Sequence, residues 1–285
     1  MKNLVISSIF LYLFTHCPLL SAESIQLQSE LNKIIVADYQ QGSENNNPVL
    51  LLHGFLQTKE FSTVTRLSAS LNESGYTVVS PTLSLGLNNR NKSLACEAIH
   101  THTLENDTDE LSQWIDWLEK KSGKKVTLIG HSAGGPVILD YLSRYGSDKI
   151  NHVVLISLSY YASGPSANET KAHEAMARSA LKNNPDKLAT YALNYCKTYP
   201  TFAGAFLSYY RWNTEKVSSN VARFKKLISV IIGTADKRID SGWRIQLHKE
   251  NKNVISIEGA SHFFDQTHEF DLSDTIENIL TKYRN

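Results

Sequence analysis

The stretch that decides the fold runs Val126-Thr127-Leu128-Ile129-Gly130-His131-Ser132-Ala133-Gly134, and a helical pattern follows it to about residue 145. Its first four residues form a continuous apolar run, as in a strand that is covered on both faces. The next five fill the pattern G-x-S-x-G between this strand and the helix. A turn of this kind strains the serine backbone and leaves room only for hydrogen atoms at the two glycines. Ser132 is therefore a candidate nucleophile.

Two alternatives to catalysis stay open for this turn. Ser132 can cap the helix, which is the commonest role of serine at such a position. The turn can also bind a nucleotide, although it lacks both G-x-G-x-x-G and the lysine of a phosphate-binding loop. Catalysis is favoured because the motif stands directly between a buried strand and a helix.

Apolar runs alternate with helical patterns on both sides of this turn. Four-residue strands are expected at 49–52, 76–79, 153–156 and 254–257, and a longer one at 227–232. Helices are expected at about 59–72, around Trp114 and Leu118, and near Ile276 and Ile279. This alternation predicts an α/β fold with an open, mostly parallel sheet flanked by helices.

The strand rhythm stops between about residues 159 and 226. This segment is rich in alanine and tyrosine and has no run typical of a buried strand, so we interpret it as a helical insertion. Tyr191, Tyr195 and Tyr199 recur every four residues, as a packed helix face would. Most of its aromatic rings are expected to form the insertion's own core.

A serine hydroxyl needs a base within hydrogen-bond reach and a third group that orients the base. Asp236 follows the strand at 227–232, and His262 follows the strand at 254–257. The carboxyl ends of parallel strands meet at the edge that carries Ser132. We predict that Ser132 is the nucleophile, His262 the general base and acid, and Asp236 the residue that orients the imidazole. Alternatives for the last two roles are nearby groups, namely His268, Asp240 and Asp265.

Acyl transfer passes through a tetrahedral oxyanion that two backbone N–H groups normally bind. One donor should be the N–H of Ala133, directly after the nucleophile. The second should come from the loop after the strand at 49–52, where Gly54 presents the N–H of Phe55, with Leu56 as the alternative. His53 is interpreted as an internal brace for this loop.

At these residues the sequence resembles the α/β-hydrolase superfamily. The matching stretches are Leu52-His53-Gly54-Phe55, Gly130-His131-Ser132-Ala133-Gly134-Gly135, Gly233-Thr234-Ala235-Asp236 and Gly259-Ala260-Ser261-His262, and the likeness runs from about residue 34 to 283. The resemblance implies an eight-stranded, mostly parallel sheet, with the insertion at about 159–226 as a helical lid over the site. It also implies that no metal and no organic cofactor is needed.

The segment around His100 and His102 departs from any branch of the superfamily that we can assign. Two imidazoles without a third ligand at a suitable spacing are weak support for a metal site. We therefore interpret them as loop or site-rim residues.

The superfamily contains esterases, lipases, thioesterases, acyltransferases and non-enzymes on one scaffold. The interpretation we favour is a serine hydrolase that cleaves a carboxylic ester of a small molecule through an acyl-enzyme intermediate. Two alternatives are an acyltransferase that uses the same three residues and a catalytically silent binding protein.

Residues 1–22 have the layout of a secretory signal peptide: Lys2, an apolar stretch, and a small-residue end at Ser21 and Ala22. The alternative is an uncleaved anchor, for which the apolar stretch is short and contains Pro18. Cleavage after Ala22 would export residues 23–285 as one α/β-hydrolase domain, periplasmic or secreted, without a stable membrane anchor.

Export has two consequences for the mature chain. Cys96 and Cys196 would remain as an even pair in an oxidising compartment, where they can form a disulfide; the alternative is two unpaired core thiols. Removal of Lys2 would leave 28 basic and 28 acidic residues, of the 29 and 28 in the full chain. A chain without net charge has no overall field that attracts nucleic acid, so no nucleic-acid partner is expected.

Overall fold

The computed structural model describes residues 22–284 and is built on an eight-stranded sheet. The expected signal peptide lies outside the described residues except for its last residue, Ala22. In sheet order the strands are β1 (Glu23–Gln28), β2 (Ile34–Gln40), β4 (Val78–Thr82), β3 (Val49–Leu52), β5 (Val126–His131), β6 (Ile150–Ile156), β9 (Ile228–Gly233) and β10 (Val254–Ile257). Within the described chain β2 alone runs against the other strands, because it pairs antiparallel with both β1 and β4. The mostly parallel sheet expected from the sequence is confirmed.

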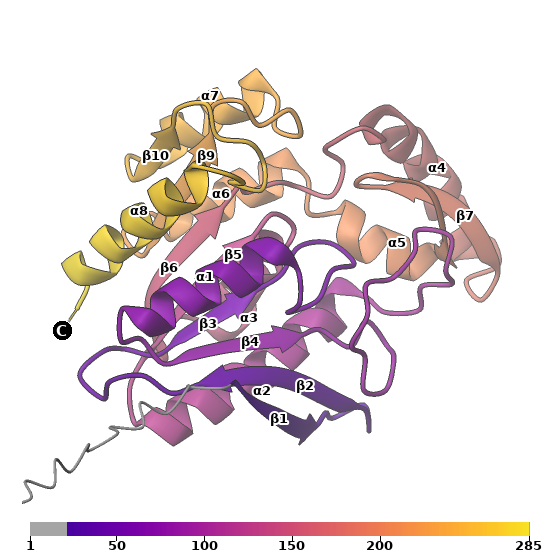
Figure 1. Ribbon diagram of the computed structural model, residues 1–285. Coiled ribbons are helices and arrows are strands. Elements are labelled where there is room, and N and C mark those ends of the chain that lie inside the picture. The colour runs from indigo at the N-terminus through magenta and orange to yellow at the C-terminus, as the bar shows by residue number, and fades with distance from the viewer. Residues whose placement is uncertain (1–21, 285) are drawn as a thin grey trace, which may run out of the picture.

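Helices cover both faces of the sheet (Figure 1). Alternate residues of β3 serve the two faces: Val49 and Leu51 pack in the core under α1 (Ser62–Glu73) and α8 (His268–Lys282), whereas Leu50 and Leu52 belong to the core on the opposite face. That second face carries α2 (Leu104–Ser122), α3 (Gly134–Tyr145), α6 (Thr214–Arg223) and α7 (Ser241–Glu250). Burial on both faces explains why β3 and β5 read as continuous apolar runs.

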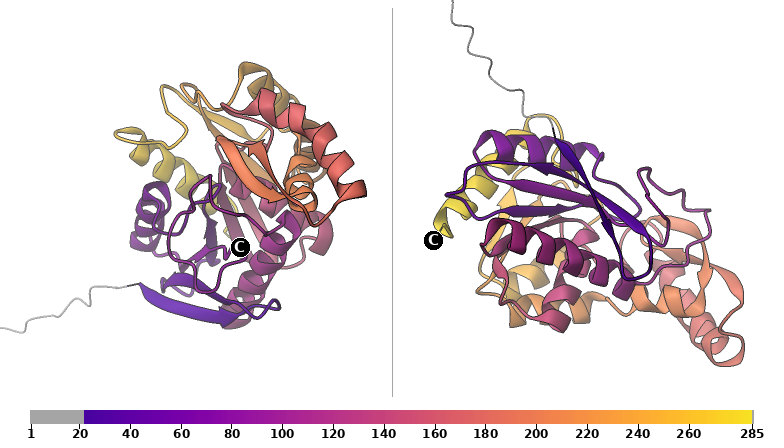
Figure 2. Two further views of the ribbon diagram at one scale, coloured as in Figure 1. Left: turned by 90° about the vertical axis from the view of Figure 1, so that its right-hand side faces the viewer. Right: turned by 90° about the horizontal axis from the view of Figure 1, so that it is seen from below.

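The insertion between β6 and β9 is not purely helical. It contains α4 (Ala167–Asn183), an antiparallel hairpin of β7 (Leu188–Leu193) and β8 (Cys196–Phe202), and α5 (Ala203–Tyr210). α4 and the hairpin lie to one side of the sheet, α5 packs on α2, and α6 packs on α3 and α7 (Figures 1 and 2). The expected helix face of Tyr191, Tyr195 and Tyr199 is wrong, because Tyr191 and Tyr199 pair across the hairpin and Tyr195 lies in its turn.

A disulfide joins Cys96, in the loop between β4 and α2, to Cys196 at the start of β8. The predicted pairing is therefore confirmed. Next to it His100 N–H donates to Pro200 O at 2.9 Å, and Thr201 Oγ1 donates to His100 O at 2.5 Å. The insertion is thus fastened to the loop that follows β4. Within residues 22–284, none of the helices combines the length and the apolar character that a membrane span requires.

Candidate active site

Ser132 lies in the sharp turn between β5 and α3 with a φ of 54°, in the left-handed region that only glycine adopts freely. Its N–H donates to Ile156 O at 2.8 Å, which fixes the turn against β6. A Cβ atom at Gly130 would lie 2.7 Å from Ile138 Cδ1, and one at Gly134 would lie 2.7 Å from His53 O. The backbone contact leaves no room for a side chain at Gly134, whereas a Cβ at Gly130 would require the Ile138 side chain to shift and would lie 3.1 Å from the backbone of Gly134.

The three residues predicted to act together are in contact. Ser132 Oγ lies 2.9 Å from His262 Nε2, and His262 Nδ1 lies 2.7 Å from Asp236 Oδ2. All three side chains are buried. Asp236 Oδ1 also accepts the N–H of Arg238 at 2.8 Å, which holds the carboxylate toward the imidazole. With its Nδ1 proton donated to Asp236, His262 presents Nε2 as the acceptor for the Ser132 hydroxyl.

The residues that the sequence offered as alternatives to Asp236 and His262 lie elsewhere or have other partners. Asp240 Oδ1 accepts the N–H of Trp243 at 2.8 Å and caps α7. Asp265 Oδ1 accepts the hydroxyl of Ser261 at 2.8 Å, and His268 begins α8. In the described part of the chain, Asp236 is the carboxylate that contacts His262.

The N–H groups of Ala133, Phe55 and Leu56 donate to no acceptor within residues 22–284. Ala133 precedes the first residue of α3, so the positive end of the helix dipole strengthens the attraction of its N–H for a negative charge. These N–H groups are thus available to a negatively charged oxygen, and both candidates for the second donor remain.

Residues 47–194, more than half of the chain, match the family model described as alpha/beta hydrolase fold. The chain belongs to the α/β-hydrolase family. Comparison with curated protein sequences gives no match.

Solved structures resemble this α/β hydrolase over most of its length. Est1E from Butyrivibrio proteoclasticus has 16% sequence identity and a TM-score of 0.65, over 91% of this chain and 98% of that one. The monoacylglycerol lipase of Paleococcus ferrophilus has 20% identity and a TM-score of 0.63, over 87% and 99%. A thermophilic esterase from Thermogutta terrifontis has 16% identity and a TM-score of 0.60, over 93% and 100%. At these identities the likeness shows the fold.

The loop of this α/β hydrolase that carries Phe55 is braced by His53, as the sequence indicated. His53 Nδ1 donates to Gly54 O at 2.8 Å, and its Nε2 accepts the N–H of Leu83 at 3.1 Å. Burial, and secondly the nearby Arg90 guanidinium, lower the pKa of His53 to about 3. The ring therefore stays neutral, which the acceptor role of Nε2 requires.

Two groups that sequence reasoning missed hold the backbone of His262. His131 Nε2 and Ser157 Oγ each donate to His262 O, both at 3.0 Å. Burial, and secondly the neighbouring His262, lower the pKa of His131 to about 3. The position of His131 inside the G-x-S-x-G motif could have indicated that it lies at the site. For Ser157, the corresponding indication is its position directly after a buried strand.

The histidines expected on a loop or at the site rim lie in the loop before α2, but both are buried. His100 stacks on Tyr199 with ring centroids 4.1 Å apart. His102 contacts the Tyr209 hydroxyl through Nδ1, and Tyr209 donates to Asp107 Oδ2 at 2.5 Å. His102 also lines a small cavity beside Phe55 and Ala133, whereas His100 packs against the insertion. Among the described residues no group of three or more His, Cys, Asp or Glu side chains is arranged to hold a metal ion.

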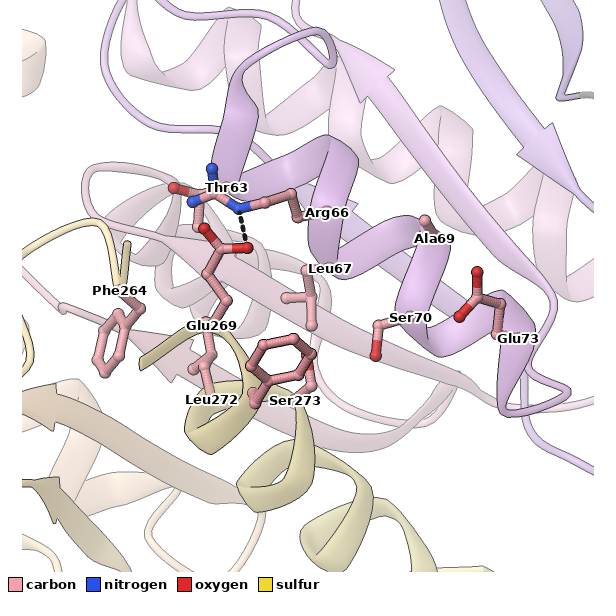
Figure 3. Close-up of a pocket in the computed structure, with 11 residues that line it drawn as sticks. Thr63, Arg66, Leu67, Ala69, Ser70, Glu73, Phe264, Glu269, Leu272 and Ser273 are labelled. Carbon is pink, nitrogen blue, oxygen red and sulfur yellow. Dashed lines mark ion pairs between the residues drawn. The ribbon is translucent and has the colours of Figure 1, made fainter. Parts of the chain in front are cut away.

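Two concave spaces near the candidate site, a small cavity and a groove, lie in different places. A cavity of about 20 Å³ is lined by the residues that carry the free N–H groups and by rings from the insertion: Phe55, Leu56, Ala133, Tyr161 and Tyr209. A groove of about 300 Å³ lies between α1 and α8, where Arg66 and Glu269 face each other at 3.1 Å (Figure 3). Phe264 lines one end of the groove, two residues after His262. Neither Ser132 nor Asp236 lines either space, but Ala133, directly after Ser132, lines the small cavity, which therefore lies beside the candidate nucleophile.

Proposed function

We propose that this protein is an exported serine hydrolase that cleaves a carboxylic ester of a small molecule through an acyl-enzyme intermediate. The observation that carries the proposal is the continuous contact from Ser132 Oγ through His262 to Asp236, at 2.9 and 2.7 Å. A serine that only caps a helix needs neither the histidine nor the carboxylate.

In the first half of the proposed reaction, Ser132 Oγ forms a bond to the ester carbonyl carbon while His262 Nε2 takes the hydroxyl proton. The carbonyl electron pair moves to the oxygen, which accepts the N–H groups of Ala133 and Phe55, with Leu56 as the alternative to Phe55. The carbon–oxygen bond to the alcohol then breaks, and the alcohol takes the proton from His262. An acyl-serine remains.

In the second half, water attacks the acyl-serine and gives a proton to His262. The bond to Ser132 Oγ breaks, the serine recovers the proton, and a carboxylic acid leaves. Asp236 stays ionised throughout and stabilises the imidazolium.

An ester is the substrate class that the family relatives favour. Two of the similar structures are named as an esterase and a monoacylglycerol lipase, and a third contains ferulic acid bound to Est1E. Those names describe the proteins that bear them; the shared fold makes ester cleavage the first reaction to test.

A fluorophosphonate probe tests the proposal directly. The folded wild type should be labelled and should cleave nitrophenyl esters, and Ser132→Ala should lose labelling and lower kcat by about 10⁴-fold or more. Ser229→Ala is a matched control, because Ser229 Oγ also lies 3.0 Å from a buried histidine, His152, but near the amino ends of β9 and β6, away from the strand ends that carry Ser132. Ser229→Ala should keep both the probe labelling and the ester cleavage of the wild type.

A folded wild type that takes up no probe would overturn the hydrolase and favour a binding protein. Faster product formation with added alcohols, giving new esters, would instead point to an acyltransferase.

The export part of the proposal rests on residues 1–22 and on the Cys96–Cys196 disulfide, a bond that is typical of oxidising compartments. N-terminal sequencing of the protein recovered from outside the cytoplasm should begin at Glu23. Recovery of the uncleaved chain in the cytoplasm would contradict it.

A further inference from the structure

The ring of Phe55 is enclosed by tyrosines of the insertion. Its centroid lies 5.9 Å from that of Tyr161 and 5.6 Å from that of Tyr195, and two further rings lie nearby: Tyr199 at 5.7 Å and Tyr209 at 6.5 Å. The residue expected to supply the second oxyanion donor is thus packed against the insertion.

Two of these tyrosines donate hydrogen bonds to backbone carbonyls on the two sides of the expected oxyanion site. Tyr195 Oη donates to Phe55 O at 3.0 Å, and Tyr161 Oη donates to Ala133 O at 3.2 Å. Each hydroxyl therefore holds the carbonyl of a residue whose own N–H is free. We propose that Tyr195 and Tyr161 are positioning residues that hold the oxyanion donors at the geometry the transition state needs; this inference rests on the proposed function.

Backbone strain makes such support necessary. Leu56, directly after Phe55, has a φ of 57°, and Ser132, directly before Ala133, has a φ of 54°. A non-glycine residue in this region is strained and persists only where its surroundings hold it. Rotation of the peptide between Phe55 and Leu56 would relieve the strain and turn the Leu56 N–H away. Tyr195 bonds the carbonyl of that same peptide.

The two tyrosines are also linked through the backbone. Asn194 N–H, in the hairpin turn beside Tyr195, donates to Tyr161 O at 3.0 Å. Cys196, directly after Tyr195, forms the disulfide with Cys96. Burial raises the pKa of both tyrosine hydroxyls, so they keep the protons that they donate. The hairpin turn and the oxyanion loops therefore form one connected unit.

The experiment compares three variants that each remove one hydroxyl and keep the ring: Tyr195→Phe, Tyr161→Phe and, as the matched control, Tyr210→Phe. Tyr210 lies in the same insertion, and its hydroxyl donates to Glu174 Oε2 at 2.7 Å, within the insertion itself. Full loss of an oxyanion donor costs about 10²–10³ in kcat, so a displaced donor should cost about 10–100-fold, with KM within about twofold. The control should match the wild type.

A second measurement separates a positioning role from a general loss of order in the insertion. Affinity for a trifluoromethyl ketone, which forms a tetrahedral adduct with serine, should fall by the same factor as kcat/KM in Tyr195→Phe and Tyr161→Phe. Unchanged kcat in both variants, a rise in KM alone, or an equal loss in Tyr210→Phe would overturn the positioning role. Absence of probe labelling in the wild type would overturn the proposed function as well, so the two failures are distinguishable.

Discussion

Residues with positive φ gather around the candidate site. Besides Leu56 and Ser132, Ser157 has a φ of 49° and Phe264 a φ of 48°. Each such residue costs on the order of 1–3 kcal/mol. Neighbouring strands hold two of them, since Ser132 N–H donates to Ile156 O and Ser157 N–H to Ile231 O, both at 2.8 Å. The rigid sheet thus maintains the strained backbone that exposes the Ser132 hydroxyl to His262.

Asp236→Asn should lower kcat by about 10³–10⁴-fold while the protein still folds. An amide can donate to Nδ1 of His262, which would move the ring proton to Nε2 and leave the Ser132 hydroxyl without an acceptor. Steady-state kinetics with a nitrophenyl ester measures the loss. Asp265→Asn is the control, because its carboxylate lies in the same loop as His262 but bonds Ser261. If Asp236→Asn kept the wild-type rate, another carboxylate would have to orient the histidine.

The sequence was sufficient to predict the contact of Ser132, His262 and Asp236, because each follows a strand that can be recognised from its apolar residues. Parallel strands then bring their carboxyl ends together without any knowledge of side-chain distances. Tyr161 and Tyr195 could not be found in this way. Their hydroxyls act on backbone carbonyls of distant segments, and those contacts depend on how the insertion packs.

Among the elements, the hairpin of the insertion shows where periodicity fails. A spacing of four residues lies close to one helical turn, but it is also twice the two-residue repeat of a strand, so it keeps side chains on one face in both structures. Tyr191 and Tyr199 are both fully buried on facing strands. The sequence analysis missed the first strand, β1, for a different reason: it has only two apolar residues, Ile25 and Leu27, and none of its residues is fully buried.

The double variant Cys96→Ser/Cys196→Ser should lower the free energy of unfolding by about 2–5 kcal/mol, because the disulfide closes a loop of 100 residues in the unfolded chain. Urea denaturation with and without dithiothreitol measures the effect. The wild type should lose stability when it is reduced, whereas the variant should not respond. A wild-type transition that is the same under both conditions would show that the bond between the β4–α2 loop and β8 contributes nothing.

At the scale of the whole molecule, two buried ionisable residues, Arg90 and Glu110, connect the loops after β3 and β4 with α2. Arg90 Nη2 donates to Gln57 O at 2.7 Å and Nε to Leu83 O at 2.6 Å. The Glu110 carboxyl accepts the N–H of Ser84 at 2.8 and 3.0 Å. Burial, more than any neighbour, raises the pKa of Glu110 to about 8. Folding therefore keeps a proton on Glu110 that the unfolded chain releases at its ordinary pKa of 4.5.

This difference in proton binding gives stability a defined slope with pH. Since folded Glu110 keeps its proton between pH 4.5 and about 8, its own contribution to stability falls as pH rises through that range. Four buried histidines oppose this slope, because burial lowers the folded pKa of His53 and His131 to about 3 and that of His100 and His152 to about 4, while the unfolded chain still binds protons at these residues near pH 6.5. The contribution of Glu110 should fall by about 1.5 kcal/mol between pH 6.5 and 8, because its slope flattens near the folded pKa.

Glu110→Gln isolates this contribution, because the amide oxygen can still accept the N–H of Ser84 but carries no proton that titrates. Urea denaturation at about pH 6.5 and about pH 8 should show that the free energy of unfolding rises with pH in Glu110→Gln, as the histidines of the unfolded chain lose their protons, and that its change in the wild type is lower by about 1.5 kcal/mol. Equal slopes in the two proteins would mean that Glu110 is already ionised in the folded state. In that case the nearby Arg90 guanidinium, which favours the charged carboxylate, would outweigh the effect of burial.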